Sequence, residues 1–368
     1  MTQRERQLLR WIEEDPMISQ QDLADKAGIT RSSVAVHISN LMKKGYIAGK
    51  GYIVRSAPYT VVIGGADMDI SGQALSSLVS GDSVPGCVQM RPGGTGLSIA
   101  HNMTLLGAEV HLITSFGDDM AGRRITTTCN ELGIDISHSL QVSNRSTSTR
   151  LRLAAPDETV EYTLSDAGVY DHLTPAFLAS RLPFLNNAQL VVVDTNLPEP
   201  TLAWLAENCR VPIFATPASA AGAARLRGIL DRIHTLKASR RETEGLSGIP
   251  LTSRNNIDRA ADVLLAAGLR RLFITLGADG VFAADRRERF FLPALPGKAV
   301  DPTGCGDAFM AALAWTFPDG VSLEHTARAG LAAASITLES ETSVNPSLCA
   351  AQVHQRSAAA RVHFEYPR

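Results

Sequence analysis

The sequence predicts an α/β protein whose mostly parallel sheet is covered by helices on both faces and is preceded by a small, separate helical module. In the larger part, apolar strand-like runs alternate with helical stretches over residues 60–276, and two stretches that break this alternation suit a small accessory sheet. Residues 1–55 carry their own helical pattern and precede Pro58, which disfavours a continuous helix across the join. We therefore expect domains at residues 1–55 and 59–368.

The amino-terminal module begins with an amphipathic helix over residues 2–14, ended by Asp15-Pro16. Ser19 and Thr30 are placed to cap a second and a third helix, because their side-chain oxygens can accept hydrogen bonds from backbone N–H groups of the first turn. The third helix is expected to turn an apolar row inward, formed by Val34, Ile38 and Leu41. Residues 45–54 are typical of two short strands around a Gly-Lys turn, which would form a wing.

The outward side of the third helix carries short polar and basic side chains. Between Arg31 and Arg55 the sequence has five basic residues and no acidic one, a charge asymmetry that suits contact with DNA phosphates. The segment resembles the winged helix-turn-helix of bacterial transcription regulators. We predict contacts to double-stranded DNA from Arg31, Ser32, Ser33, His37, Asn40, Lys43 and Lys50. The alternative is a protein-interaction or oligomerisation module whose basic residues are merely solvated.

The larger domain is expected to alternate strands and helices. Strands are predicted at residues 60–64, 109–115, 189–194, 211–215, 233–236 and 271–276. Helices are predicted at residues 97–106, 119–132, 199–207 and 257–267. Residues 71–92 are rich in Ser, Gly and Pro, and residues 147–164 alternate around a Pro-Asp turn as an antiparallel hairpin does. Together these two stretches predict a small sheet that acts as a lid.

Composition narrows the class of protein. The 368 residues are 45% hydrophobic and carry a formal charge of −2, which argues against a chain wrapped wholesale around nucleic acid. The five cysteines lie far apart and form no C-x-x-C pair, so we expect a reducing compartment and no structural zinc. The charged amino terminus lacks the apolar core of a signal peptide, and no apolar run approaches the length of a spanning helix. We expect a cytoplasmic protein with no membrane partner.

The strongest chemical signal is Gly304-Cys305-Gly306-Asp307, which is followed by an apolar helical run. A Gly-x-Gly at a helix start lets backbone N–H groups converge on an anion, assisted by the positive end of the helix dipole. Asp307 would stand beside that anion and could accept a proton from an attacking hydroxyl. Taken alone, the motif could equally be a tight turn with a helix cap. The sequence has no G-x-x-x-x-G-K-[ST] motif, so a P-loop enzyme is excluded.

The stretch from Asp301 to Phe309, D-P-T-G-C-G-D-A-F, resembles the D-T-x-G-A-G-D-x-F signature of the ribokinase-type (PfkB) carbohydrate kinase family. Three further fragments are similar to family motifs and follow in family order, at residues 63–69, 93–96 and 275–281. The resemblance implies a ribokinase-like three-layer α/β/α sandwich. It also implies ATP and Mg²⁺ as cofactors, with K⁺ as a further expectation.

By the same resemblance, Asp307 would be the catalytic base, and Gly304, Cys305 and Gly306 the anion hole. The acceptor would be bound by Asp69, Gly93, Gly94, Ser98 and Asp307. ATP would contact Thr275, Gly277, Gly280, Gly304 and Leu331, although Leu331 could equally be a plain core leucine. Glu242 would orient Mg²⁺ through water, and Asp301 and Thr303 would bind a monovalent cation.

Three substitutions depart from the family pattern. Ser98 and Ser239 stand where relatives have asparagine, and Thr216 stands where an aspartate is common. Within the family, the likeness to pseudouridine kinases suggests a pseudouridine- or ribose-like acceptor, and we expect a homodimer. One hypothesis is an active sugar or nucleoside kinase whose DNA-binding module has a regulatory role. The other is a transcription regulator that uses a weak or inactive kinase domain as a ligand sensor.

Overall fold

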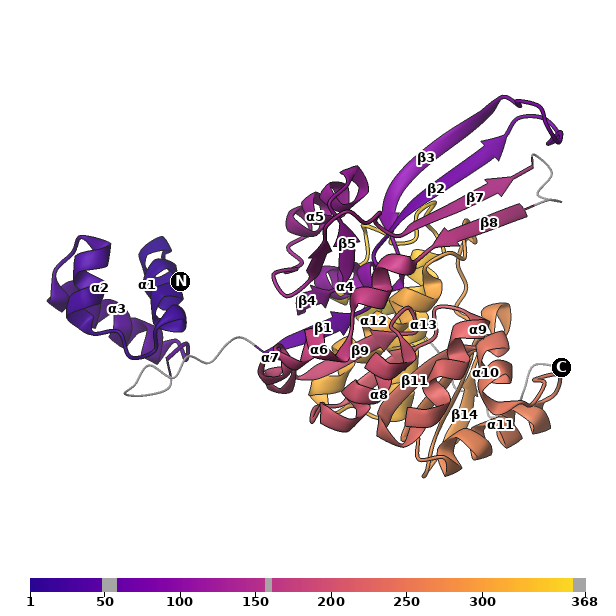
Figure 1. Ribbon diagram of the computed structural model, residues 1–368. Coiled ribbons are helices and arrows are strands. Elements are labelled where there is room, and N and C mark those ends of the chain that lie inside the picture. Colours follow the sequence, from indigo (N-terminus) through magenta and orange to yellow (C-terminus); the bar gives the residue numbers. More distant parts are fainter. Residues whose placement is uncertain (48–57, 156–160, 360–368) are drawn as a thin grey trace. The chain divides into compact units, whose positions relative to one another are not determined.

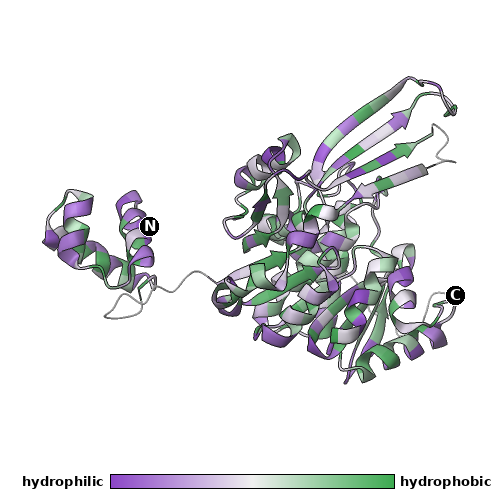
Figure 2. Cartoon of the chain, viewed as in Figure 1, coloured by the Kyte–Doolittle hydropathy of each residue, from purple (hydrophilic) through white to green (hydrophobic). Residues whose placement is uncertain are grey.

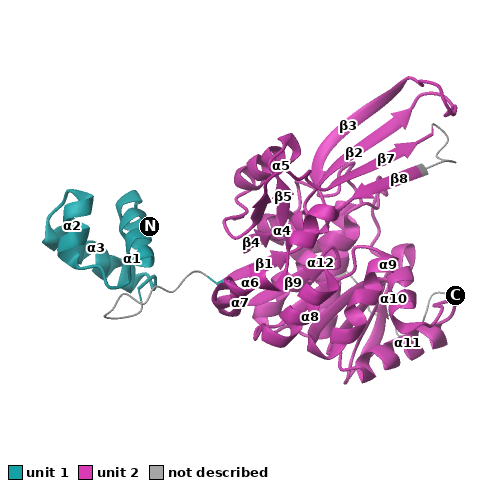
Figure 3. Ribbon diagram, viewed as in Figure 1, with its two compact units in different colours: residues 1–58 teal, residues 59–368 magenta. Residues whose placement is uncertain are grey.

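The computed structural model describes residues 1–47, 58–155 and 161–359. The chain divides into two compact units, Met1–Pro58 and Tyr59–Arg368, which Figure 3 distinguishes by colour. No helix within the described residues is both long and apolar enough to cross a bilayer.

The described part of the first unit consists of α1 (Gln3–Glu14), α2 (Gln20–Ala27) and α3 (Arg31–Lys43). Ser19 and Thr30 cap α2 and α3 as expected, since their side chains accept hydrogen bonds from the N–H groups of Asp22 and Ser33. The three helices enclose one apolar core, in which the predicted inward row of α3 is buried: Val34, Ile38 and Leu41. Lys50 and the remainder of the expected wing, 48–54, lie outside the described residues.

An internal ion pair holds α1 to the end of α3. Nζ of Lys44 lies 2.7 Å from a carboxylate oxygen of Glu5, whose side chain is only 2% exposed. The hydrogen bonds from Lys44 and from the backbone of Thr2 lower the pKa of Glu5 to about 2. Lys44 is therefore committed to the fold of the module, although it belongs to the basic stretch that the sequence associates with DNA.

The second unit is built on a sheet that has eight strands within the described residues, in the order β14-β13-β12-β11-β10-β9-β1-β4. The parallel strands are β1 (Tyr59–Ile63), β4 (Glu109–Ile113), β9 (Leu190–Asp194), β10 (Ile213–Thr216), β11 (Ile233–Ser239) and β12 (Arg271–Thr275). At one edge, β13 (Val281–Asp285) and β14 (Arg289–Leu292) continue the sheet in antiparallel fashion. All six predicted strands exist, whereas β13 and β14 were not predicted.

Apolar residues cover both faces of this sheet, which makes three layers (Figures 1 and 2). Successive residues of β1 illustrate the alternation, because Val61 and Ile63 join one core cluster and Val62 joins the other. The cluster around Val62 includes residues of α4 (Thr95–Leu105), α5 (Met120–Glu131), α12 (Cys305–Thr316) and α13 (Leu323–Thr337), and α14 (Ala350–Ala359) packs on α13. The opposite cluster includes residues of α6 (Pro175–Ala179), α7 (Leu182–Asn187), α8 (Glu199–Asn208), α9 (Ala220–Ala223), α10 (Arg240–Ser247) and α11 (Arg254–Ala266).

A second sheet, with strand order β3-β2-β7-β8, extends away from these layers as the predicted lid (Figure 1). Its strands are β2 (Asp67–Ala74), β3 (Gly86–Gly93), β7 (Thr149–Ala154) and β8 (Glu161–Asp166). The lid begins at residue 67 rather than 71, so Asp69 lies in one of its strands. The predicted strand at 109–115 also ends early, because Ser115–Gly117 forms β5, which pairs with β6 (Leu140–Val142).

The lid has one apolar and one polar face. In register across the four strands, one row contains Met90, Ile70, Leu151 and Leu164, and the next contains Val88, Gly72, Leu153 and Tyr162. Directly paired residues point to the same side of a sheet, so these rows form one continuous apolar face. Five of its side chains are 40–70% exposed: Val88, Met90, Leu151, Tyr162 and Leu164. The opposite face carries Asp69, Arg91 and Arg150.

Candidate active site

Polar residues gather at the carboxyl ends of the parallel strands. Asp194, Thr216, Ser239 and Thr275 are the last residues of β9, β10, β11 and β12, which lie side by side in the sheet. The carboxyl ends of strands in an open α/β sheet are where such folds bind ligands. The amino terminus of α12 adds the Gly-x-Gly-Asp motif to this edge.

The turn into α12 is closely packed. Gly304, the residue that caps α12, has φ +83°, and a Cβ atom placed on it would overlap the carbonyl oxygen of Ser343. The Cys305 N–H donates to the carbonyl of Pro302 (3.2 Å), whereas no hydrogen bond within the described residues uses the N–H of Gly304 or Gly306. Burial raises the pKa of the Cys305 thiol to about 11, so this side chain is not a nucleophile at neutral pH.

Asp307, the predicted base, lies in the first turn of α12. Burial raises the pKa of this carboxyl group to about 7, and the positive charge of Lys237 opposes the rise. The negative charges of Asp194 and Glu242 also raise the pKa of Asp307. Burial likewise raises the pKa of Asp194 to about 6, although its carboxylate accepts hydrogen bonds from the N–H groups of Gly65 and Asn196, which lower the pKa. A pKa near neutral suits a group that must take up a proton at physiological pH.

Lys237 is a site residue that sequence reasoning missed. It lies in β11 and is 6% exposed, and its Nζ donates to Oγ1 of Thr216 at 3.3 Å. A Cβ atom on Gly306 would lie 2.7 Å from that Nζ, so the ammonium group lies against Gly306 of the predicted anion hole. The available signal was a lysine in an otherwise apolar buried strand, because a buried charge needs a partner. Thr216, one of the departures from the family pattern, supplies part of that partnership.

We expect Lys237→Met to move the pH dependence of catalysis. Below its pKa, Asp307 is protonated and cannot accept a proton, so kcat/KM falls as the pH drops through about 7. Removing the neighbouring positive charge raises that pKa, and the acid limb of the profile therefore moves to higher pH. The measurement is a pH–rate profile of the wild type beside Lys237→Met, with the exposed Lys298→Met as the matched loss of charge. Superimposable acid limbs in all three proteins would contradict the placement of Lys237.

The predicted acceptor residues meet between the lid and α4. A Cβ atom on Gly93 would overlap a carboxylate oxygen of Asp69, so the Gly-Gly pair lets this carboxylate approach the backbone. Gly94 caps α4 with φ +95°. Burial and the charge of Asp67 raise the pKa of Asp69 to about 6, while Arg150 lowers it. Because Arg150 also lowers the pKa of Asp307, it electrostatically links the acceptor residues to the expected base.

Ser98 is buried within α4, and its backbone carbonyl oxygen accepts a hydrogen bond of 2.7 Å from Nδ2 of Asn102. Oδ1 of Asn102, one turn further on, is buried and has no hydrogen-bond partner among the residues that the structure describes. Nearby in the site, the Tyr170 hydroxyl donates to a carboxylate oxygen of Asp67. Sequence reasoning missed Asn102, Asp67 and Tyr170, since these positions lie far apart along the chain.

Glu242 is held by the start of α10. Its Oε2 accepts the N–H of Ser239 at 2.6 Å, and Ser239 Oγ accepts the N–H of Glu242, which forms a reciprocal capping box. Ser239 thus performs a capping role that asparagine would also fill. No group of three or more His, Cys, Asp or Glu side chains among the described residues could hold a metal ion directly. The residues present fit a magnesium ion held through water and phosphate oxygens rather than one enclosed by the protein.

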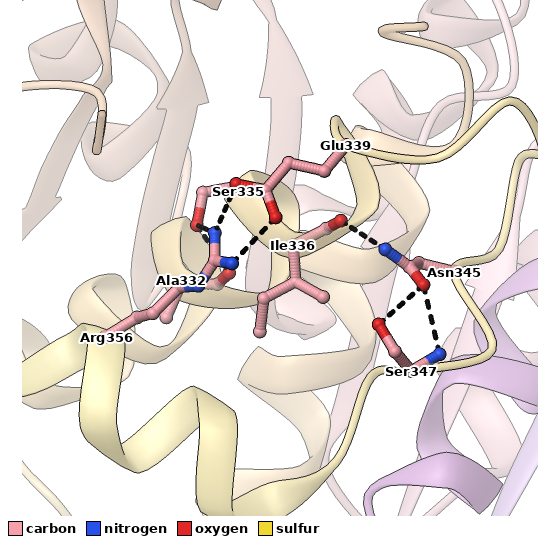
Figure 4. Close-up of polar contacts among 7 residues, drawn as sticks. All are labelled: Ala332, Ser335, Ile336, Glu339, Asn345, Ser347 and Arg356. Atoms are coloured by element: carbon pink, nitrogen blue, oxygen red, sulfur yellow. Dashed lines mark hydrogen bonds and ion pairs between the residues drawn. The ribbon is translucent and has the colours of Figure 1, made fainter. Parts of the chain in front are cut away.

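Asp301 and Thr303 lie beside the loop after α13. A carboxylate oxygen of Asp301 accepts the N–H of Thr303 (2.8 Å), and the Asp301 N–H donates to the carbonyl of Leu338 (3.3 Å). The carbonyl of Ser343, in the same loop, lies beside Gly304. Binding of a monovalent cation by Asp301 and Thr303 stays a prediction. Figure 4 shows how the base of this loop is held: Arg356 of α14 pairs with Glu339 (3.0 and 2.7 Å), and Asn345 donates to the carbonyl of Ile336 (2.6 Å).

The residues predicted to bind ATP lie in two places. Thr275 pairs with Ser239 at the carboxyl edge, and Gly277 and Gly280 form the turn into β13 with positive φ angles. An ion pair between Arg240 and Asp279 (3.1 Å) joins this turn to α10. Leu331 is 7% exposed and belongs to the apolar core cluster between the sheet and α13. Its packing agrees with the alternative of a core leucine, and its contact with adenine stays a prediction.

A partly buried carboxylate beside a buried lysine, at a glycine-rich helix start on the carboxyl edge of the sheet, is the arrangement expected of a phosphotransferase. Comparison of the sequence with known protein families identifies the domain more closely. Residues 57–348 match the family model for the pfkB family of carbohydrate kinases, and residues 1–48 match that for winged helix-turn-helix DNA-binding domains. The chain therefore belongs to the pfkB family of carbohydrate kinases, which transfer a phosphoryl group to an alcohol, and carries an N-terminal winged helix-turn-helix.

Similar proteins cover nearly all of the chain. The uncharacterised sugar kinase YeiI of Escherichia coli is 36% identical over 95% of this chain and 97% of its own length. The pseudouridine kinase of the same organism is 34% identical over 82% of this chain and 96% of its own. Among solved structures, a carbohydrate kinase from Agrobacterium tumefaciens is 26% identical with a TM-score of 0.72, covering 83% of this chain and 99% of that one. The ribokinase of Arabidopsis thaliana with ribose and ATP shares the fold, with a TM-score of 0.74, 22% identity and coverage of 82% and 99%.

Proposed function

We propose that this protein transfers the γ-phosphoryl group of ATP to a hydroxyl of a nucleoside or ribose-like sugar, with Asp307 as the base. Asp307 takes the hydroxyl proton as the new oxygen–phosphorus bond forms and the bond to the departing ADP breaks. The N–H groups of Gly304 and Gly306, with Lys237, stabilise the negative charge of the phosphoryl oxygens. The observation that carries the proposal is the position of Asp307 in the first turn of α12, beside the glycine-rich start of the helix against which Lys237 lies. Mg²⁺, when bound near Glu242, would neutralise phosphate charge.

The proposed acceptor is a nucleoside or a ribose-like sugar. Similarity to the pseudouridine kinase supports a nucleoside-like acceptor. We propose that Asp69 accepts hydrogen bonds from its hydroxyls and that Ser98 presents a shorter polar group than asparagine would. The test is to measure ADP release with a panel that contains pseudouridine, uridine, ribose and hexoses, each with and without Mg²⁺ and K⁺. The kinase proposal would be contradicted if no member of the panel raised the rate of ADP release above the rate measured without acceptor.

The second candidate function is a regulator whose kinase domain acts as a sensor. The substitutions Ser98, Ser239 and Thr216 favour it, because they alter positions that usually contact substrate and metal. The retained capping box at Ser239 and the Lys237–Thr216 hydrogen bond favour activity instead. Ligand-dependent DNA binding without phosphorylation of any acceptor is the outcome that distinguishes the sensor.

We also propose that the first unit binds double-stranded DNA through α3. Arg31 and Lys43 are exposed on this helix, and Val36 is 59% exposed between them. A helix with basic ends and short central side chains suits the major groove, where an apolar side chain can contact a thymine methyl group. His37 and Asn40 are partly exposed on the same helix.

Replacing Arg31 and Lys43 together by alanine should weaken DNA binding about tenfold or more and reduce the slope of log K against log salt by about 2. The physical reason is the loss of two phosphate contacts. Binding is measured by mobility shift on a duplex from the upstream region of the gene at several salt concentrations. The control is the double replacement of the exposed Arg6 and Arg10 on α1 by alanine, which removes the same charge. Equal weakening by both pairs would indicate a general effect of charge and not a recognition helix.

The proposed homodimer uses the apolar face of the lid. An exposed apolar surface that spans all four strands is costly in water unless another surface covers it. A second copy of the lid offers the same chemistry, and a dimer would also supply two helix-turn-helix modules for two half-sites. The opposite face of the same strands carries Asp69 and Arg150, so pairing of the lids would also steady the acceptor residues.

We expect Leu164→Asp in the lid to convert a dimer into monomers, because it places a charge within the apolar face that the proposed interface buries. Leu164 is 69% exposed in the single chain, so its replacement leaves the core of the unit intact. Sedimentation velocity measures the change in mass. Val263→Asp on α11, at an apolar residue that is 46% exposed, is the matched control and should leave the mass unchanged. A wild-type protein that is monomeric at micromolar concentration would contradict the proposed interface.

A further inference from the structure

An open pocket lined by charged side chains lies at the opposite edge of the main sheet from the candidate active site. It has a volume of about 680 Å³, and its lining includes Arg270, Arg271, Arg286 and Arg287 with His234 and Asp231. His234 is the second residue of β11 and Arg271 the first of β12, whereas the active-site residues end these strands. At about 3.3 Å per residue, the length of β11 separates the two sites by roughly 16 Å.

Strand pairing brings the four arginines together from two Arg-Arg pairs in the sequence. Arg271 is directly opposite Asp285 in the antiparallel pair of β12 and β13, and Arg286 and Arg287 follow at once. Oδ1 of Asp285 accepts the N–H groups of Arg287 (2.7 Å) and Glu288 (2.9 Å), which fixes the turn. On the other wall, a Cβ on Gly268 would lie 2.6 Å from Cα of Asp231, so the chain before β12 passes close to Asp231.

The arginines of this cavity lack the partners that other surface arginines have. Within the described part of the chain, none of the four forms an ion pair, whereas Arg289 pairs with Asp258 and Asp262 and Arg254 with Asp258. Burial, and then the charges of Arg271 and Arg270, lower the pKa of His234 to about 4, so this ring is neutral at pH 7. Four cationic and two anionic side chains therefore give the lining a net charge of +2. Clustered positive charges of this kind are stabilised by an anion.

We propose that this cavity is a binding site for a small phosphorylated compound with two or more negative charges, distinct from the site of phosphoryl transfer. Guanidinium groups match phosphate oxygens in a bidentate geometry, and the volume lies within the range of small-molecule pockets. Asp231 can accept hydrogen bonds from hydroxyl groups of the same ligand. The hollow shape and the carboxylates of Asp231 and Asp285 favour a compact ligand over a continuous nucleic-acid backbone.

The test is calorimetric titration of the full chain with inorganic pyrophosphate, with and without a saturating β,γ-imido analogue of ATP. We expect saturable binding of one pyrophosphate per chain that persists when the analogue fills the nucleotide site. The double variant Arg286→Gln with Arg287→Gln should weaken it about tenfold or more, because two charge-assisted contacts are lost. Arg270→Gln, on the other wall, should weaken it as well and guards against a local folding defect of the turn.

The matched control is Arg254→Gln with Arg289→Gln, which removes the same charge from arginines that are already ion-paired. It should keep the wild-type affinity for pyrophosphate. Equal weakening in the control, or no saturable binding up to about 10 mM, would overturn the site. The proposal would also fail if the Arg286 and Arg287 variant lost affinity for duplex DNA while no chain bound pyrophosphate, because the arginines would then be a DNA-contacting surface.

Discussion

Asp307→Asn should lower kcat by about 10²- to 10⁴-fold, the range that a positioned general base contributes. Asparagine has nearly the same shape, so the start of α12 and the affinity for ATP should change little. Burial raises the pKa of the carboxyl group, which means that the folded state disfavours its charged form at neutral pH. Removing that charge should leave the unfolding temperature unchanged or slightly higher. The measurement is steady-state phosphorylation of the best acceptor, together with a thermal unfolding curve.

The control for this variant is Asp319→Asn, which alters an exposed carboxylate just beyond the other end of α12. It should keep wild-type kcat. If Asp307→Asn retained more than about a tenth of the wild-type kcat, the hydroxyl proton would have to leave by another route, and the assigned base would be wrong. Unchanged DNA binding by the variant is expected under both the kinase and the sensor hypotheses, so this readout controls for the fold of the first unit.

Gly304→Ala should reduce kcat/KM for ATP by about 10²-fold or more, comparable to the loss of an oxyanion-hole donor. The residue has φ +83°, and an added methyl group would overlap the carbonyl oxygen of Ser343. Either the turn or the loop after α13 must move, and each movement displaces the N–H groups at the start of α12. Kinetics with ATP as the varied substrate measure the loss.

Gly320→Ala separates this steric effect from ordinary backbone strain. Gly320 also has a positive φ, +65°, but a Cβ there meets no atom within 4 Å. The replacement should therefore lower the free energy of unfolding by only about 1–2 kcal/mol and leave kcat/KM unchanged. Similar kinetic losses in both variants would show that Gly304 matters for general stability and not for the geometry of the anion hole.

Local signals in the sequence predicted much of the fold. Ser19 and Thr30 cap their helices because capping depends on residues within one turn, and the six parallel strands were visible as short apolar runs. The edge strands β13 and β14 were not predicted; they pair with each other around a short turn at the edge of the sheet. The fold class and the family were predicted correctly, while the roles of the individual site residues stay predictions.

The sequence by itself determined the helix-start motif around Asp307, the strand and helix alternation, and the separate amino-terminal module, since each depends on neighbouring residues. Only the tertiary structure decided that Lys237 contacts Gly306 and that Arg150 links Asp69 to Asp307. It also decided that two Arg-Arg pairs share one cavity and that the apolar residues of four lid strands form one face. These arrangements depend on strand order and register, which bring together residues that are tens to hundreds of positions apart, and no local spacing records them.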